Sequence, residues 1–302
     1  MPRSLPTDAR DAVLAWYDDH GRALAFRSTR DPYAILVSEV MAQQTQVGRV
    51  VEAWSRFITQ FPTVDALAAA TPAAVLRAWQ GMGYDRRALN LRRAAQAIRD
   101  EHGGRVPDDV ETLERLPGVG PYSARAVAAI AYGRPLGAVD TNIRRVLRRA
   151  LTGSDDKAPA RAWIQAAADA SVDRARPAAW THALMDIGAT ICRPTNPACA
   201  TCPIASWCRF ASVATSAGRV TRPACRSRTR RPQPAFTATT RWLRGRILDR
   251  LRAAIDGSWT SVAGPVGEHD ASAVTAALRA LEHDGLVELH PKDPLLARLA
   301  TI

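Results

Sequence analysis

Apolar residues recur at three- and four-residue steps through most of the chain before Cys208, which is the period of an amphipathic helix. This pattern predicts helices at residues 11–19, 32–60, 72–79, 85–101, 108–115, 121–132, 141–151, 158–169 and 177–191. The breaks between them coincide with pairs that disrupt helices, such as Phe61-Pro62 and Gly103-Gly104. No alternation typical of a strand precedes residue 210, so the sequence predicts an all-α fold for this part.

The pattern changes after Cys208. Residues 211–240 are rich in arginine, proline, serine and threonine and have little apolar periodicity, which predicts a basic linker. Two further helices are expected at 242–255 and 271–284, followed by a short strand that starts at Gly285. This order resembles a small winged-helix unit, which we predict for residues 241–302.

The charge of the chain points to a polyanionic partner. The 302 residues, enough for two or three domains, carry 41 lysines and arginines against 29 acids, a formal net charge of +12. A generally basic, soluble surface is the alternative. The distribution favours the polyanion, because residues 219–252 hold eleven arginines and a single acid, Asp249.

The chain lacks the sequence features of export and membrane insertion. No apolar run approaches the length of a membrane span, and the first residues do not read as a signal peptide. We therefore expect a soluble cytoplasmic protein that does not bind a membrane.

Four cysteines lie close together in the spacing Cys192-x6-Cys199-x2-Cys202-x5-Cys208. Four thiolates can hold one tetrahedral zinc ion or one iron–sulfur cluster, and unrelated buried cysteines are the third possibility. Zinc sites usually bring together two close pairs of ligands, whereas here one Cys-x-x-Cys is flanked by longer arms. The spacing favours a cluster. Cys225, in the predicted linker, is expected to be a free thiol.

A glycine-rich turn, Leu116-Pro-Gly-Val-Gly-Pro121, separates two predicted helices. Its glycines, Gly118 and Gly120, allow a tight turn whose N–H groups face outward on both sides of Val119. With a helix N-terminus behind it, such a turn suits a phosphate oxygen. An ordinary loop between two helices is the equally simple interpretation.

Two carboxylates and a polar triplet complete the candidate chemistry. Asp140 precedes the helix predicted at 141–151 and is suited to cap it, a role that also aims the carboxylate. Glu39 lies in an apolar helix, where burial would raise its pKa and make it a proton donor near neutrality. Gln43, Gln44 and Thr45 offer amides and a hydroxyl for base edges or phosphates, although solvent would satisfy them equally well.

The hairpin, Asp140 and the four cysteines, in this order, resemble helix-hairpin-helix DNA glycosylases that carry a [4Fe–4S] cluster. Within that group, five motifs are similar to those of adenine DNA glycosylases of the MutY type. They lie at residues 38–47, 81–84, 116–122, 139–146 and 185–192. The similarity runs from about residue 10 to residue 210, and the whole chain resembles the short actinobacterial members.

The resemblance implies roles at the reacting bond. Glu39 would protonate adenine at N7, and Asp140 would stabilise the oxocarbenium sugar or bond to it briefly. Tyr122 and Asn142 would support this centre. The chemistry agrees, because cleaving a glycosidic bond needs one carboxyl to donate a proton and another to stay ionised beside the developing cation.

The resemblance also implies contacts with double-stranded DNA. The target nucleotide must leave the duplex to be cleaved. Gln44 and Tyr84 would wedge into the stack beside it, and the four cysteines would bind the cluster. Other implied contacts to DNA or to the base are Arg27, Gln43, Thr45, Gly118, Val119, Gly120 and His182.

Tyr122 separates two kinds of relative. Bifunctional members that resemble endonuclease III carry a lysine at this position, whose amine forms a Schiff base and leads to strand cleavage. Lysine occurs here only at positions 157 and 292, outside these motifs. We therefore expect a monofunctional enzyme that leaves an abasic site.

Four positions depart from the family pattern. Ala25-Phe26-Arg27 stands for Pro-Trp-Arg, Ala42 for leucine, and Thr141 for glycine. His182 occupies a position where glutamate or glutamine often meets the adenine edge. Three of these positions would line the base pocket. The chain after the cluster is also too short for the Nudix-like domain that recognises 8-oxoguanine in many members.

The predicted architecture has two helical lobes and a small appendage. Residues 28–137 would form a six-helix barrel with the hairpin, and residues 1–27 with 138–210 would form the cluster lobe. DNA with adenine opposite 8-oxoguanine or guanine would lie in the groove between them, bound by a monomer. A mismatch thymine glycosylase and a non-catalytic DNA-binding protein are the alternatives. Gln43-Gln44-Thr45 argues against the first, and the presence of both Glu39 and Asp140 argues against the second.

Overall fold

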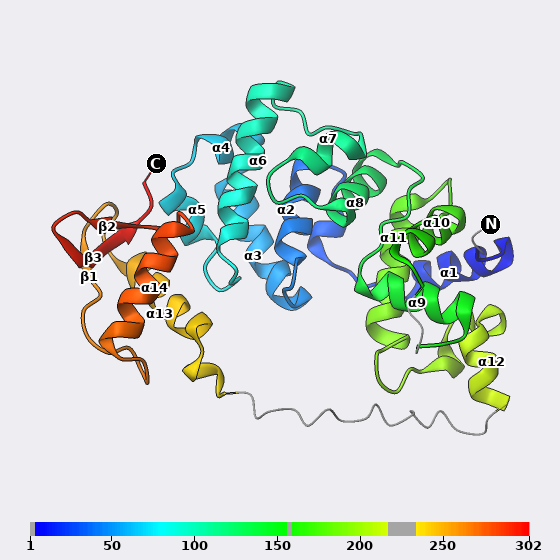
Figure 1. Cartoon of the computed structure of the whole chain (residues 1–302). Coiled ribbons are helices and arrows are strands. Elements are labelled where there is room, and N and C mark those ends of the chain that lie inside the picture. The colour runs from blue at the N-terminus through cyan, green and yellow to red at the C-terminus, as the bar shows by residue number, and fades with distance from the viewer. Residues whose placement is uncertain (1–3, 156–158, 217–233, 302) are drawn as a thin grey trace. The chain divides into compact units, whose positions relative to one another are not determined.

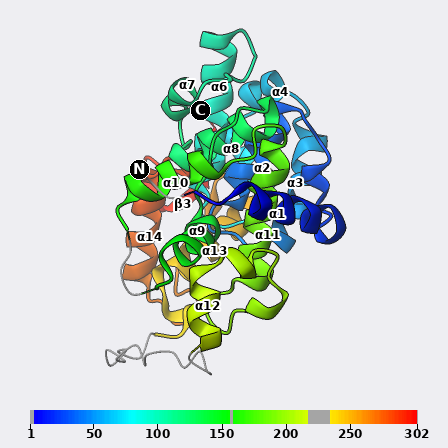
Figure 2. The same cartoon turned by 90° about the vertical axis from the view of Figure 1, so that its right-hand side faces the viewer.

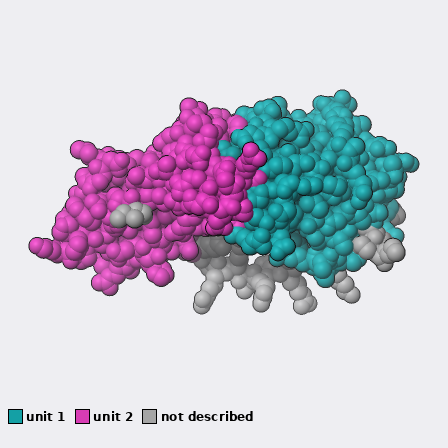
Figure 3. All heavy atoms as spheres, turned by 90° about the horizontal axis from the view of Figure 1, so that it is seen from above, with its two compact units in different colours: residues 1–39, 107–115, 119–225 teal, residues 40–106, 116–118, 226–302 magenta. Residues whose placement is uncertain are grey.

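The computed structural model describes residues 4–155, 159–216 and 234–301. The chain forms two compact units, each assembled from separate stretches of sequence. The first contains Met1–Glu39, Pro107–Arg115 and Val119–Cys225, and the second contains Val40–Val106, Leu116–Gly118 and Arg226–Ile302 (Figure 3). The predicted boundaries at residues 27, 137 and 210 stay predictions.

The first unit is helical throughout its described part. Its helices include α1 (Thr7–His20), α7 (Val110–Arg115), α8 (Pro121–Tyr132), α9 (Thr141–Thr152), α10 (Arg161–Ser171), α11 (Pro177–Asp186) and α12 (Arg209–Ser216). Short helical turns lie at η1 (Ala25–Arg27), η3 (Cys199–Thr201) and η4 (Ala205–Trp207), and a single π-helical turn, η2 (Ile187–Ile191), continues α11. The apolar faces of α1, α9, α10 and α11 meet around Leu147, Trp180 and Ile187, and α12 packs beside α9 (Figure 2).

Helix α2 (Pro32–Ala42) runs from the first unit into the second, where α3 (Val47–Gln60), α4 (Val64–Ala69), α5 (Pro72–Ala78) and α6 (Arg86–His102) follow (Figure 1). Helix α6 packs against α4 and α5. Phe57 and Trp79 meet edge to face in this core, with ring centroids 5.8 Å apart.

The stretch 234–301 adds a turn at η5 (Phe236–Ala238), two helices and a small sheet to the second unit. Helices α13 (Thr240–Ala253) and α14 (Ala271–His283) pack together against strands β1 (Thr260–Ser261), β2 (Val287–His290) and β3 (Asp293–Leu299) (Figure 1). The antiparallel sheet has the order β1-β3-β2, with Thr260 opposite Ala297 and Val287 opposite Leu299. The assignment of residues 241–302 to the winged-helix class stays a prediction.

The helical character predicted from the apolar period is confirmed, and so is the strand after Gly285. The single helix predicted over 32–60 is wrong in its middle. The chain leaves the helix between Ala42 and Val47, and Gln44 adopts a left-handed backbone with φ 56°. Helix α4 was not predicted, because its six residues are too few to show a period.

The predicted basic linker, residues 211–240, is only partly described. Its first residues continue α12, and its last ones form η5 and the start of α13. Residues 217–233, with Cys225, lie outside the described residues. Within the described ranges, no helix combines the length and the apolar character needed to cross a membrane.

Candidate active site

Glu39 is a buried carboxyl of the first unit. Its helix reads Pro-Tyr-Ala-Ile-Leu-Val-Ser-Glu-Val-Met-Ala, and only 8% of Glu39 is exposed. Burial, aided by the charge of Asp140, raises the pKa of Glu39 to about 7, against a hydrogen bond from Tyr122 and the charge of Arg27, which both lower it. Its Oε2 has no hydrogen-bond partner among the described residues. A proton at neutral pH would therefore sit on an unengaged, desolvated oxygen.

Tyr122 stands at the beginning of α8, where Pro121 occupies the first turn. Burial and the nearby carboxylates of Glu39 and Asp140 raise the pKa of Tyr122 well above its ordinary value. The phenol therefore stays protonated at neutral pH and can donate a hydrogen bond to Glu39. Its hydroxyl also lies 4.0 Å from the sulfur of Met185 in α11.

Asp140 caps helix α9, as the sequence predicted. Its Oδ1 accepts a hydrogen bond from the Ile143 N–H at 2.6 Å, and its Oδ2 accepts one from Asn142 Nδ2 at 3.0 Å. Both oxygens are thus oriented by the first turn of one helix, so the cap fixes the direction in which the carboxylate points.

Asn142 connects Asp140 to the segment that carries the first cysteine. The side-chain oxygen Oδ1 of Asn142 accepts a hydrogen bond from Arg145 Nη2 at 2.8 Å, and the same nitrogen donates to the backbone carbonyl of Gly188 at 2.6 Å. Arg145 Nε donates to the Cys192 carbonyl at 2.7 Å. A side chain at Gly188 would bring its Cβ within 2.6 Å of Asn142 Cβ, so glycine is what permits this close approach.

Asp186 is the residue of the first unit that the sequence reasoning missed. It is fully buried and accepts two hydrogen bonds from Arg27, each 2.8 Å long, and others from Arg22. Burial opposes its ionisation, but the hydrogen bonds from the two arginines outweigh that cost and hold the pKa of Asp186 below its ordinary value. Its position four residues after His182 in a quoted motif was the available signal. Arg27, predicted to contact DNA or the base, has its guanidinium engaged by this carboxylate.

His182 lies one helical turn before Asp186 and is almost completely buried. Burial, together with the charge of Arg27, lowers the pKa of His182 to about 3. The imidazole is therefore neutral at physiological pH, with one ring nitrogen as a donor and the other as an acceptor. Such a group can recognise a neutral base edge without adding charge to the site.

The predicted wedge residues lie in the second unit. Gln44 and Tyr84 both have left-handed backbones, with φ 56° and 48°, and Tyr84 is 41% exposed. Non-glycine residues seldom adopt this conformation, and those that do often belong to functional sites. Neither feature was visible in the sequence.

Arg87 was also missed by the sequence reasoning. It contacts both loops that carry the predicted wedge residues Gln44 and Tyr84, here called the wedge loops. Its Nη1 donates to the carbonyls of Val40 and Met41 at 3.0 Å, and also to that of Gln43. Its Nη2 donates to Thr45 Oγ1 at 3.0 Å and to the Gly83 carbonyl at 3.0 Å. One guanidinium thus satisfies the carbonyls freed where α2 ends and those of the loop before α6.

The hairpin glycine Gly118 has a demonstrable steric role. Its φ is +81°, and a Cβ there would lie 2.8 Å from Asn90 Cβ in α6. Its carbonyl accepts a hydrogen bond from Gln43 Nε2 at 3.3 Å. Val119 and Gly120 belong to the first unit, where Gly120 precedes α8.

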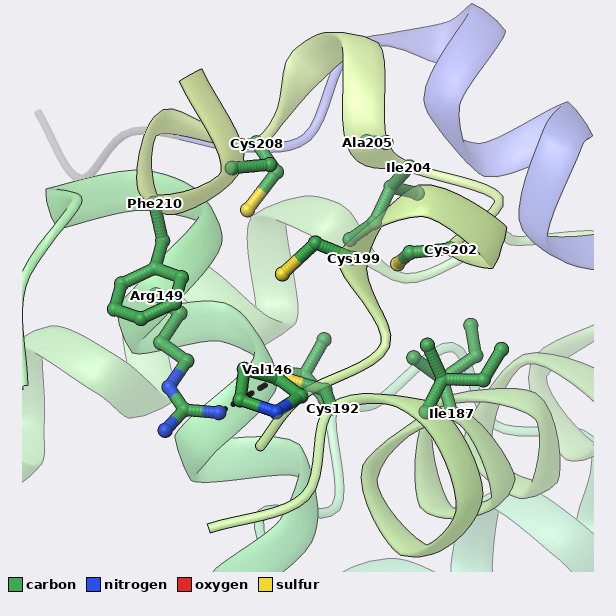
Figure 4. A pocket seen from close by; sticks show the side chains of 13 residues that line it. Val146, Arg149, Ile187, Cys192, Cys199, Cys202, Ile204, Ala205, Cys208 and Phe210 are labelled. Atoms are coloured by element: carbon green, nitrogen blue, oxygen red, sulfur yellow. Dashed lines mark hydrogen bonds between the residues drawn. The ribbon is translucent and has the colours of Figure 1, made fainter. Parts of the chain in front are cut away.

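The four cysteines of the motif line one apolar cavity in the first unit (Figure 4). Ile187 and Phe210 are among the side chains that complete its wall. All four are free thiols, and burial raises the pKa of Cys202 to about 12. Arg149 Nη1 donates to Cys192 Sγ at 3.5 Å.

Within the described part of the chain, no three His, Cys, Asp or Glu side chains converge closely enough to hold one metal ion. The four thiols nevertheless line a common space, and thiolates are donors that both zinc and iron–sulfur clusters accept. The guanidinium of Arg149 beside Cys192 would compensate part of the charge of bound thiolates.

Comparison with known proteins gives a consistent classification. Residues 37–167 match the HhH-GPD superfamily of base excision DNA repair proteins. The chain is 43% identical over 285 residues to an adenine DNA glycosylase of Mycolicibacterium smegmatis, which covers 91% of each protein. It is 39% identical over 214 residues to the adenine DNA glycosylase of Homo sapiens, covering 67% of this chain and 39% of that protein.

Solved structures show the same fold. A thermostable thymine-DNA glycosylase superposes with a TM-score of 0.64 at 27% identity, covering 68% of this chain and 95% of that one. Endonuclease III in a non-covalent complex with DNA superposes with a TM-score of 0.58 at 23% identity, with the same coverage. The 43% identity to the Mycolicibacterium smegmatis protein over 91% of this chain shows that the chain belongs to the adenine DNA glycosylase family.

Proposed function

We propose that this chain binds double-stranded DNA and hydrolyses the N-glycosidic bond of adenine paired with 8-oxoguanine or guanine. Membership of the adenine DNA glycosylase family supports a glycosylase that acts on adenine. The observation that carries the mechanism is the pair formed by Glu39, whose pKa is about 7, and Asp140, held at a helix N-terminus. One carboxyl is a neutral acid and the other an oriented anion, as this reaction requires.

Glu39 is the proposed general acid. It transfers its proton to N7 of the adenine, and the C1′–N9 bond breaks with its electron pair moving onto the base. Base release thus avoids an anionic leaving group. The unpaired Oε2 of Glu39 is the available oxygen, and the Tyr122 phenol stabilises the carboxylate that remains.

Asp140 is the proposed partner of the sugar cation left at C1′. Its negative charge stabilises the oxocarbenium ion directly or through a brief covalent bond, until water adds and an abasic site remains. Asn142 and the Ile143 N–H hold the carboxylate in one orientation while this charge develops. Because position 122 holds a tyrosine, no amine is expected to form a Schiff base and cut the strand.

The wedge and hairpin are proposed to position the duplex. Gln44 and Tyr84, held through Arg87 on two neighbouring loops, would enter the stack from which the adenine is extruded. Gln43, Thr45 and the Gly118–Gly120 turn would contact the same duplex. His182, neutral and buried, would face the edge of the adenine, with Arg27 fixed beside it by Asp186.

The four cysteines are proposed to hold a [4Fe–4S] cluster, which would supply cross-links between α11 and α12 and an electron-transfer group. The four cysteines share a cavity with Val146, Ile187 and Ile204, which supports a structural role for the loop that carries them next to α9. We further propose that the chain acts as a cytoplasmic monomer and that residues 241–302 form a winged-helix-like unit.

Base release from three duplexes tests the proposal. Adenine opposite 8-oxoguanine, adenine opposite guanine and thymine opposite guanine are incubated with the protein, and strands are separated with and without alkali. Adenine should be lost from the first two duplexes, and nicks should appear only after alkali. Release of thymine alone would establish the mismatch thymine glycosylase instead, and binding without any base release would establish a non-catalytic protein.

A further inference from the structure

A groove of about 880 Å³ lies in the second unit, between the wedge loops and the first turns of α13. Its wall includes Gln44 and Tyr84 on one side and the segment Thr240–Arg246 on the other. Seven arginines and three aspartates line it, so its lining carries a net positive charge. None of the catalytic residues proposed above belongs to it.

Arg241, in the first turn of α13, packs on the exposed ring of Tyr84. The central guanidinium carbon lies 4.0 Å from the ring centroid, which is a close cation–π contact. Among the described residues no carboxylate forms an ion pair with Arg241, whereas Arg244 and Arg246 pair with Asp284 and Asp249. The Arg241 side chain therefore presents an uncompensated charge and a flat donor surface beside the wedge.

Other contacts fix α13 to the wedge loop. Arg252, near the end of α13, is 5% exposed and forms an ion pair with Asp85, which is 12% exposed and follows Tyr84. Arg252 Nε also donates to the Leu76 carbonyl at 3.0 Å, and Arg77 Nη2 donates to the Ala254 carbonyl at 3.2 Å. This largely buried ion pair keeps α13 against the loop, because separating the two charges would leave each of them buried without a partner. The Arg241–Tyr84 contact is therefore part of the folded unit.

We propose that α13 belongs to the DNA-binding site, and that Arg241 contacts the nucleotide opposite the excised adenine while holding the ring of Tyr84 in place. This inference rests on the proposed function, in which Tyr84 enters the base stack. A side chain packed on the wedge ring is within reach of the nucleotides that the wedge separates. The planar guanidinium can donate hydrogen bonds to both O6 and N7 of guanine, and to O6 of 8-oxoguanine, whose N7 carries a hydrogen.

Binding measurements on intact protein test this role. Each duplex carries one 2′-fluoro-adenosine, which resists hydrolysis, opposite 8-oxoguanine, guanine or cytosine. Arg241→Ala should weaken binding roughly tenfold opposite guanine, as loss of a bidentate base contact implies, less than that but measurably opposite 8-oxoguanine, and least opposite cytosine. Arg241→Lys should retain the salt dependence of binding but not the preference, because lysine keeps the charge without the planar fork.

The matched control is Arg250→Ala. Arg250 is also an exposed arginine of α13 but does not line the groove, so its replacement should leave the opposite-base preference unchanged. If Arg241→Ala behaves like Arg250→Ala on every duplex, the proposal is wrong. Equal weakening with all three opposite bases, with the salt slope reduced by about one, would make Arg241 a phosphate contact only and would also overturn the proposal.

A parallel assay of adenine release separates this inference from the proposed function. If wild type releases adenine and the Arg241 variants bind unchanged, only the role of α13 is lost. If wild type binds the duplexes without releasing adenine, the proposed catalysis fails, whereas the binding comparison still decides the role of Arg241.

Discussion

Glu39 links protonation to both chemistry and stability, because its burial makes the charged form unfavourable. The acid form is the one proposed to act, and the pKa of Glu39 is about 7. The single-turnover rate of adenine release should therefore fall as pH rises through about 7, by about tenfold per pH unit at higher pH. Rapid-quench measurements from pH 5.5 to pH 9 check this. A rate that is flat across the whole range would argue against Glu39 as the acid.

The same shift predicts the stability of Glu39→Gln. A carboxyl whose folded pKa is raised above 4.5 stabilises the folded state less as pH rises from about 4.5 to about 7. Glutamine does not titrate at this position. The free energy of unfolding of Glu39→Gln, taken relative to wild type, should therefore increase by about 2–3 kcal/mol between pH 4.5 and pH 8. Urea denaturation at the two pH values measures the difference. An equal difference at both would contradict the shift.

Asp140→Asn isolates the charge beside the sugar from the helix cap. Asparagine caps helices about as well as aspartate, so the free energy of unfolding should change by less than about 1 kcal/mol. Adenine release should fall by roughly two or more orders of magnitude, while duplex binding stays close to wild type. Thermal denaturation, equilibrium binding and single-turnover kinetics measure the three quantities. Near-normal release would leave capping as the function of Asp140.

Some site residues could be predicted from the sequence and others could not. Glu39 and Asp140 stood out because a carboxylate in an apolar helix and one before a helix are recognisable locally. Asp186 and Arg87 did not, since their importance lies in partners distant in sequence, such as Arg22 and Val40. Ion pairs and hydrogen bonds between residues so far apart in the sequence have no local signature.

At the scale of elements, the Arg87 side chain connects two loops of the second unit. It bonds to carbonyls at the end of α2 and in the loop that carries Tyr84. Arg87→Ala should lower the free energy of unfolding by about 2–4 kcal/mol, because buried carbonyls lose their donor. It should also weaken duplex binding, since both wedge loops are released.

Arg99→Ala is the control for that variant. Arg99 lies on the same helix, α6, but is exposed, and its ion pair within the described residues is with its neighbour Asp100. Its removal should leave the free energy of unfolding nearly unchanged. Equal effects of the two substitutions in chemical denaturation would show that the Arg87 contacts contribute little.

Element boundaries could be predicted where the apolar period runs over many residues. The predictions failed where the backbone leaves the helical conformation that the sequence pattern suggests. The gap between α2 and α3 is the clearest case. Residues 43–46 are compatible with a helix by propensity, yet Gln44 leaves it with a positive φ that the Arg87 contacts stabilise. Strands β1 and β3 were missed for a similar reason, because two-residue and irregular apolar stretches carry no readable alternation.

At the scale of the whole molecule, the four cysteines line a cavity in the last part of the first unit. Cys199→Ser removes one proposed ligand. We expect iron content and visible absorbance to fall, with α12 losing its packing on α9 and duplex binding weakening before chemistry does. Iron analysis and hydrogen exchange of residues 199–212 measure this. Full activity in a colourless, zinc-containing protein would contradict the cluster.

The interleaving of the two units bears on how the chain is made. Residues 40–106 leave the ribosome early, but their partner stretch, residues 226–302, is synthesised only after almost all of the first unit. At about 5–20 residues per second the early stretch waits on the order of ten seconds or more for the helix that covers its loop. During that interval the surface destined for α13 is open to chaperones and proteases. A nonsense mutation near residue 226 would release a chain in which this surface is never covered, so we expect the truncated protein to be degraded faster than the full chain.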